Sequence, residues 1–271
     1  MAAPLWNRLG AAGAALTLAA CASTTSPGAV DVDRRQLLIV PAATVEQMAL
    51  ISFNEQNEKA RAAGKLVTQG PELERLRRIA ARLIRQAPAF RSDASSWNWE
   101  TVLIDSPALN ASVAPGGKIT VYTGLIRQLR LTDDEIAMVM GHEIAHALRE
   151  HGRERISQAA AQNVLTSVAL GAMQSREAQV KMAGQFADIL YNLPNSRKAE
   201  IEADKIGLEL AARAGFDPQA SVSVWQKMSQ ANERGGPPEF LSTHPANDSR
   251  IAELRELIPA VMPLYRAAPK A

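Results

Sequence analysis

Three of the four histidines in this 271-residue chain lie in one stretch, GHEIAHALREH, at residues 141–151. On a helix, His142 and His146 differ by only about 40° around the axis, so both rings project to the same side and can share one metal ion. Glu143 lies beside His142, where its carboxylate can reach a metal-bound water rather than the metal. In this spacing two imidazoles hold zinc, and the glutamate takes a proton from a water whose pKa the metal has lowered.

The third histidine of this stretch is expected to have a different role. His151 lies nine residues after His142, which corresponds to about 900° of rotation and to the opposite face of a continuous helix. We therefore expect a structural or surface role for His151 rather than a place on the same ion.

A zinc site needs a third protein ligand, and the later segment SRKAEIEADKIG offers one. The metzincin pattern would place a histidine ten residues after His142, but Gly152 stands there, so that class is excluded. Glu200 and Asp204 share one helical face, so the first could bind zinc while the second accepts the N–H of a ligand histidine. Such an acidic pair by itself more often forms a solvated helix face. Glu202 points about 200° away from Glu200 and is the poorer ligand candidate.

Most of the chain has a helical pattern, and the helix that carries the histidines has a clear start. Thr132 is a good N-cap, acidic residues fill the first turn, and an apolar face begins at Ile136. Between residues 97 and 122, the β-type runs WETVLID and KITVYTG flank a turn at Pro115. Other helical patterns cover residues 44–64, 71–84, 153–190, 196–214 and 218–233, and a last helix begins near residue 246. The sequence therefore predicts one α+β domain, mainly helical, with a small sheet.

The N-terminus is typical of a bacterial lipoprotein. Arg8 precedes an apolar run that is too short to span a bilayer as a mature helix. Small residues before the single cysteine, Cys21, resemble the lipobox, at which a signal peptidase cuts and the cysteine is lipidated. A free cysteine in the core is the alternative. We expect residues 1–20 to be a signal peptide, residues 21–36 a lipidated N-terminus and flexible tether, and residues 37–265 the folded domain.

Composition narrows the possible functions. The formal net charge of +2, without basic clusters, gives no case for nucleic-acid binding. A single cysteine excludes an intramolecular disulfide, so the core must stabilise the domain without one.

Ala22 follows Cys21 in place of the aspartate that favours inner-membrane retention in enterobacterial lipoproteins, which points weakly to the outer membrane.

Five segments, which together span nearly all of the chain after the signal peptide, resemble one known family. They are RRQLLIVPAATVEQMAL, LNASVAPGGKITVYTGLI, GHEIAHALREH, LPNSRKAEIEADKIGLELAARAGFDP and STHPANDSRI. The family is the zinc metallopeptidases that include the CAAX prenyl protease, HtpX and the bacterial envelope lipoproteins LoiP and BepA, and the resemblance is closest to the envelope lipoproteins. It implies a gluzincin-like metalloprotease fold whose small sheet edges the active-site cleft.

The resemblance also implies roles for particular residues. It implies one zinc ion per chain on His142, His146 and Glu200, with Glu143 as the general base. It further implies that the substrate pairs with a strand of the protein by β-addition. The residues expected in that strand are Asn110, Ala111 and Ser112.

His244 and Arg250 lie in the last of the five segments and are candidate catalytic residues. His244 either donates a hydrogen bond to the oxyanion formed at the scissile carbonyl or occupies the open position of zinc and holds the enzyme latent. We expect the latent form, because of the resemblance and the flexible flanking segments GGPPEF and PAND. Arg250 either serves the oxyanion or completes a salt bridge.

These expectations combine into a zinc endopeptidase of the bacterial periplasm, anchored by its lipid to the outer membrane. The resemblance implies that its substrates are misfolded or unassembled envelope proteins. The alternative is a non-proteolytic assembly factor or chaperone with a closed zinc site, because structural zinc has four protein ligands whereas catalytic zinc keeps an open position. A lipoprotein with an accidental histidine pair is a third reading. Nothing in the sequence indicates an oligomeric state.

Overall fold

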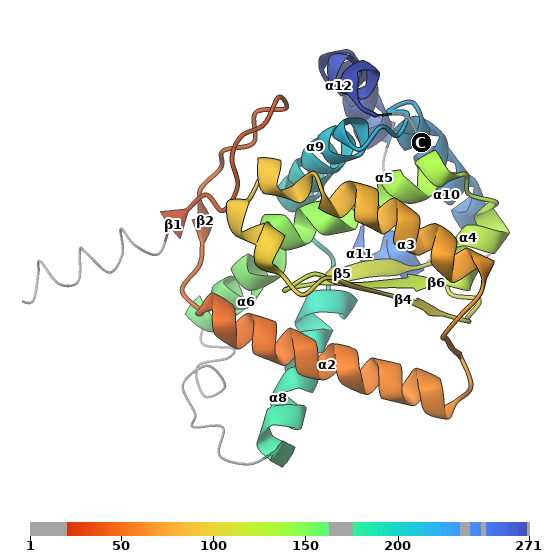
Figure 1. Cartoon of the computed structure of the whole chain (residues 1–271). Coiled ribbons are helices and arrows are strands. Elements are labelled where there is room, and N and C mark those ends of the chain that lie inside the picture. The colour runs from red at the N-terminus through yellow and green to blue at the C-terminus, as the bar shows by residue number, and fades with distance from the viewer. Residues whose placement is uncertain (1–20, 163–175, 234–238, 245–247, 270–271) are drawn as a thin grey trace, which may run out of the picture.

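The computed structural model describes residues 21–162, 176–233, 239–244 and 248–269, and the helix with the histidine pair lies at its centre (Figure 1). This helix, α5 (Asp133–Leu148), begins with the expected cap. The Thr132 hydroxyl accepts a hydrogen bond from the Glu135 N–H at 3.3 Å, and the Glu135 carboxylate accepts one from the Thr132 N–H at 2.9 Å. This capping box satisfies two N–H groups that a helix start leaves unpaired.

A second buried helix, α9 (Arg197–Arg213), packs along α5 through a contact between two glycines. A Cβ on Gly207 would lie 2.7 Å from the backbone nitrogen of His142, and one on Gly141 would lie 2.9 Å from the carbonyl oxygen of Gly207. The two backbones therefore approach more closely than any residue with a side chain allows. This approach brings the carboxylates of α9 against the histidines of α5.

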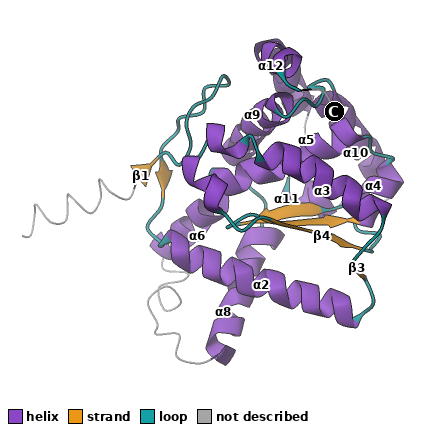
Figure 2. Cartoon of the chain, viewed as in Figure 1, coloured by secondary structure: helices purple, strands orange, loops and turns teal. Residues whose placement is uncertain are grey.

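A small four-stranded sheet lies next to α5 (Figure 2). Its strands, in spatial order, are β3 (Leu66–Val67), β4 (Glu100–Ile104), β6 (Lys118–Tyr122) and β5 (Ala111–Ala114). β4 and β6 are parallel, and each outer strand is antiparallel to its neighbour. Among the described strands, β5 pairs with β6 alone and is an edge strand. The predicted fold class, mainly helical with a small sheet, is confirmed.

Helices cover both faces of the sheet (Figure 1). α3 (Pro71–Ile84) and α5 lie over one face, whereas α2 (Ala42–Ala62) lies under the other and packs against α8 (Arg176–Ala187). The remaining elements include α4 (Thr123–Leu129), α6 (His151–Ala161), α10 (Ala220–Glu233), α11 (Glu239–Thr243), α12 (Asp248–Ala267), 3₁₀ turns at Ala87–Ala89 and Ser92–Ser96, and a π-helical turn at Asp188–Asn192. The main core includes residues of α3, α5, α9, α10 and the sheet, and a smaller one joins α2, α6 and α8.

The segment before α2 is packed against the domain, which differs from the expected flexible tether. β1 (Cys21–Ala22) pairs with β2 (Gln36–Leu37). Between them, the N–H groups of Ala29 and Val30 donate to the buried carboxylate of Glu209 on α9, at 2.7 and 3.1 Å. The segment is held by a carboxylate about 180 residues away in the sequence, so short-range composition alone could not reveal it.

Two more predictions concern the helix over residues 153–190 and the signal peptide at residues 1–20. The continuous helix expected over residues 153–190 is wrong, because α6 ends at Ala161. The signal peptide expected at residues 1–20 lies outside the described part of the chain. None of the described helices combines the length and the apolar character that crossing a bilayer requires.

Candidate metal centre

Four side chains bring ligand atoms to one buried point: His142 and His146 of α5, Glu200 of α9, and His244, which follows α11. The Nε2 atoms of the first two histidines are 3.1 Å apart, and the Glu200 oxygens lie 3.4 and 3.3 Å from them. The ligand atoms of a tetrahedral zinc ion with bonds of about 2.0–2.1 Å are separated by roughly 3.3 Å. The spacing and chemistry of these residues therefore fit one zinc ion.

Asp204, one turn after Glu200, holds the first of these histidines in place. Its Oδ1 lies 2.9 Å from Nδ1 of His142, the ring nitrogen that faces away from the cluster. Arg250 of α12 donates to both Asp204 oxygens at 2.7 Å and lies 2.8 Å from a Glu200 oxygen. The guanidinium also packs on the Trp225 ring, 4.0 Å from its centre. The sequence left open whether Arg250 serves the oxyanion or completes a salt bridge, and in the structure it forms salt bridges with Asp204 and Glu200.

Burial and neighbouring charges shift the pKa values of these side chains. Burial opposes ionisation of Asp204, but the charge of Arg250 and the contact with His142 lower its pKa below the usual range. The surrounding histidines likewise overcome burial and hold the pKa of Glu200 well below its ordinary value. Burial would lower the pKa of His142, but its two carboxylate partners raise it to about 9. His142 must therefore release a proton when a metal ion binds.

His146 differs in its protonation. Burial lowers the pKa of His146 well below its ordinary value, and the Glu200 contact does not restore it. The ring is therefore neutral, with one nitrogen free of a proton, which is the form that binds a cation.

His244 completes the cluster as a potential fourth ligand. Its Nδ1 lies 3.0 Å from Glu200 Oε1 and 3.3 Å from His142 Nε2. Its Nε2 lies 3.4 Å from Glu143 Oε1. Phe240 stacks on the His244 ring, with the ring centres 4.4 Å apart and the planes tilted by 23°. The ring is thus held between the metal ligands and the candidate general base.

Glu143 has one buried oxygen without a hydrogen bond. Its Oε1 has no hydrogen-bond partner among the described residues, and burial raises the pKa of this carboxyl. A buried polar atom without a partner usually marks a functional group or a place for water. A carboxylate with a raised pKa next to metal ligands is suited to take up a proton.

A cleft of about 550 Å³ opens beside the cluster. Its lining includes Asn110, Ala111, Ser112, Glu143, His146 and Tyr191. Asn110 directly precedes the edge strand β5, and Ala111 and Ser112 belong to it, so the expected substrate strand borders the same cleft as the candidate ligands His146 and His244. A strand edge offers unpaired backbone groups, which an extended peptide can bind.

His151, expected on the opposite face of the helix, lies against a metal ligand instead. Its Nδ1 is 2.8 Å from Nδ1 of His146. The assumption of a continuous helix is wrong here, because α5 ends at Leu148, Glu150 adopts a left-handed conformation (φ +52°) and α6 begins at His151. Glycine commonly marks such a reversal, and with glutamate in that place the sequence carries no signal of it. Glu202 does not reach the cluster but contacts the other side of the His151 ring at 3.0 Å.

Residues 72–258 match peptidase family M48. The chain is 38% identical over 180 residues to the Bos taurus mitochondrial metalloendopeptidase OMA1, an alignment that covers 62% of this chain and 34% of the relative. It is 36% identical over 173 residues to the Schizosaccharomyces pombe mitochondrial metalloendopeptidase OMA1, covering 62% and 49%. It is 29% identical over 170 residues to the Escherichia coli beta-barrel assembly-enhancing protease, covering 60% and 35%. The aligned part thus spans about a third to a half of each relative.

The two mitochondrial relatives share higher identity with this chain than the bacterial one does. The expected closest resemblance to bacterial envelope lipoproteins therefore stays a prediction. The family match spans the four clustered side chains, and the cluster has the ligand types and spacing for zinc. The chain belongs to peptidase family M48, and its metal centre is that of a zinc metallopeptidase.

Proposed function

We propose that this chain is a zinc endopeptidase of the bacterial envelope that cleaves unfolded or unassembled polypeptides and is kept latent by His244. The observation that carries the proposal is the convergence of His142, His146 and Glu200 on one buried point, beside Glu143 and an open strand edge. A zinc ligand set, a general base and an edge that binds backbone are what peptide hydrolysis requires in one cleft.

The residues of the chain divide the reaction between them. His142, His146 and Glu200 hold zinc, which when bound polarises the scissile carbonyl and acidifies water. Glu143 takes the proton of the attacking water and passes it to the leaving amine. Burial favours the protonated form of its carboxyl, which makes Glu143 a stronger base than an exposed glutamate.

His244 controls whether this reaction can begin. A zinc ion with four protein ligands has no open position, and His244 Nδ1 lies as close to Glu200 as a fourth ligand does. Its other nitrogen faces Glu143, so the same ring also lies against the general base. We propose that His244 leaves this position when a substrate enters the cleft.

The proposed substrates are extended polypeptides that lack stable structure. The edge of β5 borders the cleft and offers hydrogen bonds to any backbone rather than to particular side chains. The assignment to envelope proteins is supported by the Escherichia coli beta-barrel assembly-enhancing protease and by the lipobox-like residues before Cys21. The proposed location is the periplasm, with the lipid on Cys21 in the outer membrane.

A second candidate function rests on the same fourth ligand. If His244 stays in place, the zinc site is closed and the cleft binds polypeptides without cutting them, as in an assembly factor or chaperone. The two functions differ in whether the bound zinc contributes to hydrolysis.

Degradation of an unfolded model protein by the purified chain lacking residues 1–21 distinguishes these functions. The zinc-loaded wild type is expected to cut, whereas Glu143→Gln, which keeps the size of the side chain, and a chelator-treated sample should not. Cleavage that persists in Glu143→Gln would contradict the assigned base. Stoichiometric zinc without cleavage, in the wild type and in His244→Ala, would support the binding function instead.

A further inference from the structure

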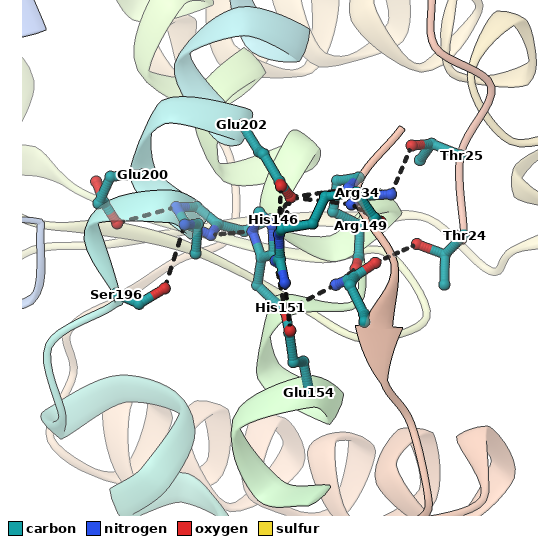
Figure 3. A network of polar contacts seen from close by, with 12 residues as sticks. Thr24, Thr25, Arg34, His146, Arg149, His151, Glu154, Ser196, Glu200 and Glu202 are labelled. Carbon is teal, nitrogen blue, oxygen red and sulfur yellow. Dashed lines mark hydrogen bonds and ion pairs between the residues drawn. The ribbon is translucent and has the colours of Figure 1, made fainter. Parts of the chain in front are cut away.

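Behind the metal cluster, a buried chain of polar contacts leads from His146 toward the N-terminal segment (Figure 3). His146 Nδ1, the nitrogen that faces away from the cluster, lies 2.8 Å from His151 Nδ1. On the other side of the ring, His151 Nε2 lies 3.0 Å from Glu202 Oε2. All three side chains are buried, so they depend on one another for hydrogen bonds.

The proton positions along this chain follow from the role of His146. Its Nε2 faces the cluster and must be free of a proton to bind metal, so the neutral ring carries its proton on Nδ1. That N–H donates to His151 Nδ1, which must therefore be the acceptor. The proton of His151 then lies on Nε2 and is donated to Glu202. Every donor has an acceptor, and the orientation of the His146 ring is fixed.

Two arginines hold Glu202 at the end of this chain. Arg149 donates to Glu202 Oε2 at 3.1 and 3.0 Å, and Arg34 donates to Glu202 Oε1 at 2.5 Å. Glu202 therefore lies between two guanidinium groups, which hold its carboxylate in place as the acceptor for His151.

Arg34 links this arrangement to the N-terminal segment. Besides Glu202, it contacts both oxygens of Glu154 at 2.6 and 2.7 Å. In the same segment, the hydroxyl of Ser23 accepts a hydrogen bond from Arg149 at 3.0 Å. The hydroxyl of Thr25 accepts another at 3.2 Å (Figure 3). Residues just after Cys21 thus complete the polar environment of the second ligand histidine.

The two ligand histidines are supported in parallel ways. His142 is held by Asp204, which Arg250 clamps from behind. His146 is held through His151 by Glu202, which is clamped by arginines. In each case a carboxylate held by arginine fixes the ring nitrogen that does not face the cluster, and this is how supporting residues orient metal ligands and tune their affinity.

We propose that His151 and Glu202 form a positioning relay for the metal ligand His146, and that Arg34 of the N-terminal segment clamps this relay. The inference rests on the proposed zinc site and deepens it. Loss of the relay should leave the fold intact and weaken zinc binding about 10- to 100-fold, the usual effect of removing a partner of a metal ligand. Loss of Arg34 should weaken zinc binding less than loss of the relay does, because Arg149 still holds Glu202.

The test is the zinc dissociation constant, measured by competition with a chromophoric chelator in Glu202→Gln and in His151→Phe. Glu209→Gln is the matched control, because Glu209 is equally a buried carboxylate of α9 that binds the N-terminal segment but does not contact the relay. We expect weaker zinc binding and an altered Co²⁺ absorption spectrum in the two relay variants but not in Glu209→Gln. In the absence of metal, Glu202→Gln and Glu209→Gln should unfold at similar midpoints.

The outcomes separate this inference from the proposed function. If Glu202→Gln and Glu209→Gln bind zinc as tightly as the wild type, or lose affinity equally, the relay does not position His146 and the inference is wrong. If the wild type itself binds no zinc at this cluster, the proposed function fails first. If the zinc dissociation constant rises more in Glu202→Gln than in Glu209→Gln, the relay is supported, whether or not the protein cuts a substrate.

Discussion

At the scale of single residues, the carboxylates that support the two ligand histidines are buried and paired with arginines. Arg250 lies between Asp204 and Glu200, and the N-terminal Arg34 contacts Glu202 and Glu154. Buried ion pairs of this kind do not by themselves make a fold stable, but removing one partner is costly because a charge stays behind. The acidic side chains should therefore make the protein sensitive to low pH.

We predict that the free energy of unfolding decreases as the pH is lowered from about 5 toward 2. The pKa of Glu202 is lowered to about 2 from an ordinary value of 4.5. A carboxyl with a depressed folded-state pKa contributes stability that is fully present above the unfolded-state value and is lost as pH falls through the folded-state value. Urea unfolding midpoints of the metal-free protein at pH 6 and pH 3 measure this loss.

Glu202→Gln is the matched comparison for this prediction. It removes the titrating group and keeps the size of the side chain, so the variant should be less stable at pH 6 and should lose less stability on acidification. An equal loss in the variant and in the wild type would show that other carboxyls account for the acid sensitivity.

Contacts between residues of the same helix could be predicted from their spacing in the sequence, whereas contacts between distant segments could not. The i and i+4 pairs His142 with His146 and Glu200 with Asp204 could be assigned to common faces because the helical period is fixed. The contact between His151 and Glu202 could not, because it depends on a chain reversal at Glu150 that glutamate does not signal.

At the scale of elements, the centre depends on how closely α5 and α9 approach each other. Gly207 allows the contact, and a Cβ there would lie 2.7 Å from the backbone nitrogen of His142. Because backbone atoms cannot move aside as a flexible side chain can, an added methyl group must push the helices apart and shift Glu200 away from the histidines. The helix starts at Thr132 and Ser196 follow ordinary capping rules, but this approach is a tertiary feature.

We predict that Gly207→Ala weakens zinc binding and lowers the unfolding midpoint. Gly184→Ala on α8 is the matched control, since a Cβ there meets no atom within 4 Å and should be neutral or stabilise by about 0.5–1 kcal/mol. Thermal unfolding and zinc titration of both variants test this prediction. Wild-type zinc affinity in Gly207→Ala would show that the helix approach does not position the ligands.

At the scale of the whole molecule, the N-terminal segment joins the proposed lipid anchor to the metal centre. β1 begins at Cys21, and the following residues bind Arg149, Glu202 and Glu209. The fold class could be predicted from helical periodicity and the two β-type runs. The packing of this segment could not, since its partners lie more than 100 residues away in the sequence.

We predict that Cys21→Ser releases the full-length protein from the membrane fraction of a bacterial host, because the lipid would have no attachment site. Ala22→Asp is the control: it keeps the cysteine and should leave the protein in the membrane fraction, with more of it in the inner membrane. Fractionation followed by detection of the protein measures both effects. Membrane association that Cys21→Ser does not reduce would exclude the lipid anchor.

The most direct test of the account is the rate at which zinc-loaded His244→Ala cleaves an unfolded protein, compared with the wild type and with the double variant His244→Ala, Glu143→Gln. Because His244 occupies the position of a fourth ligand, its removal should open the site and raise the rate, and the double variant should be inactive. A rate in His244→Ala that falls by roughly 100-fold or more would contradict the latent form and would assign His244 to the oxyanion.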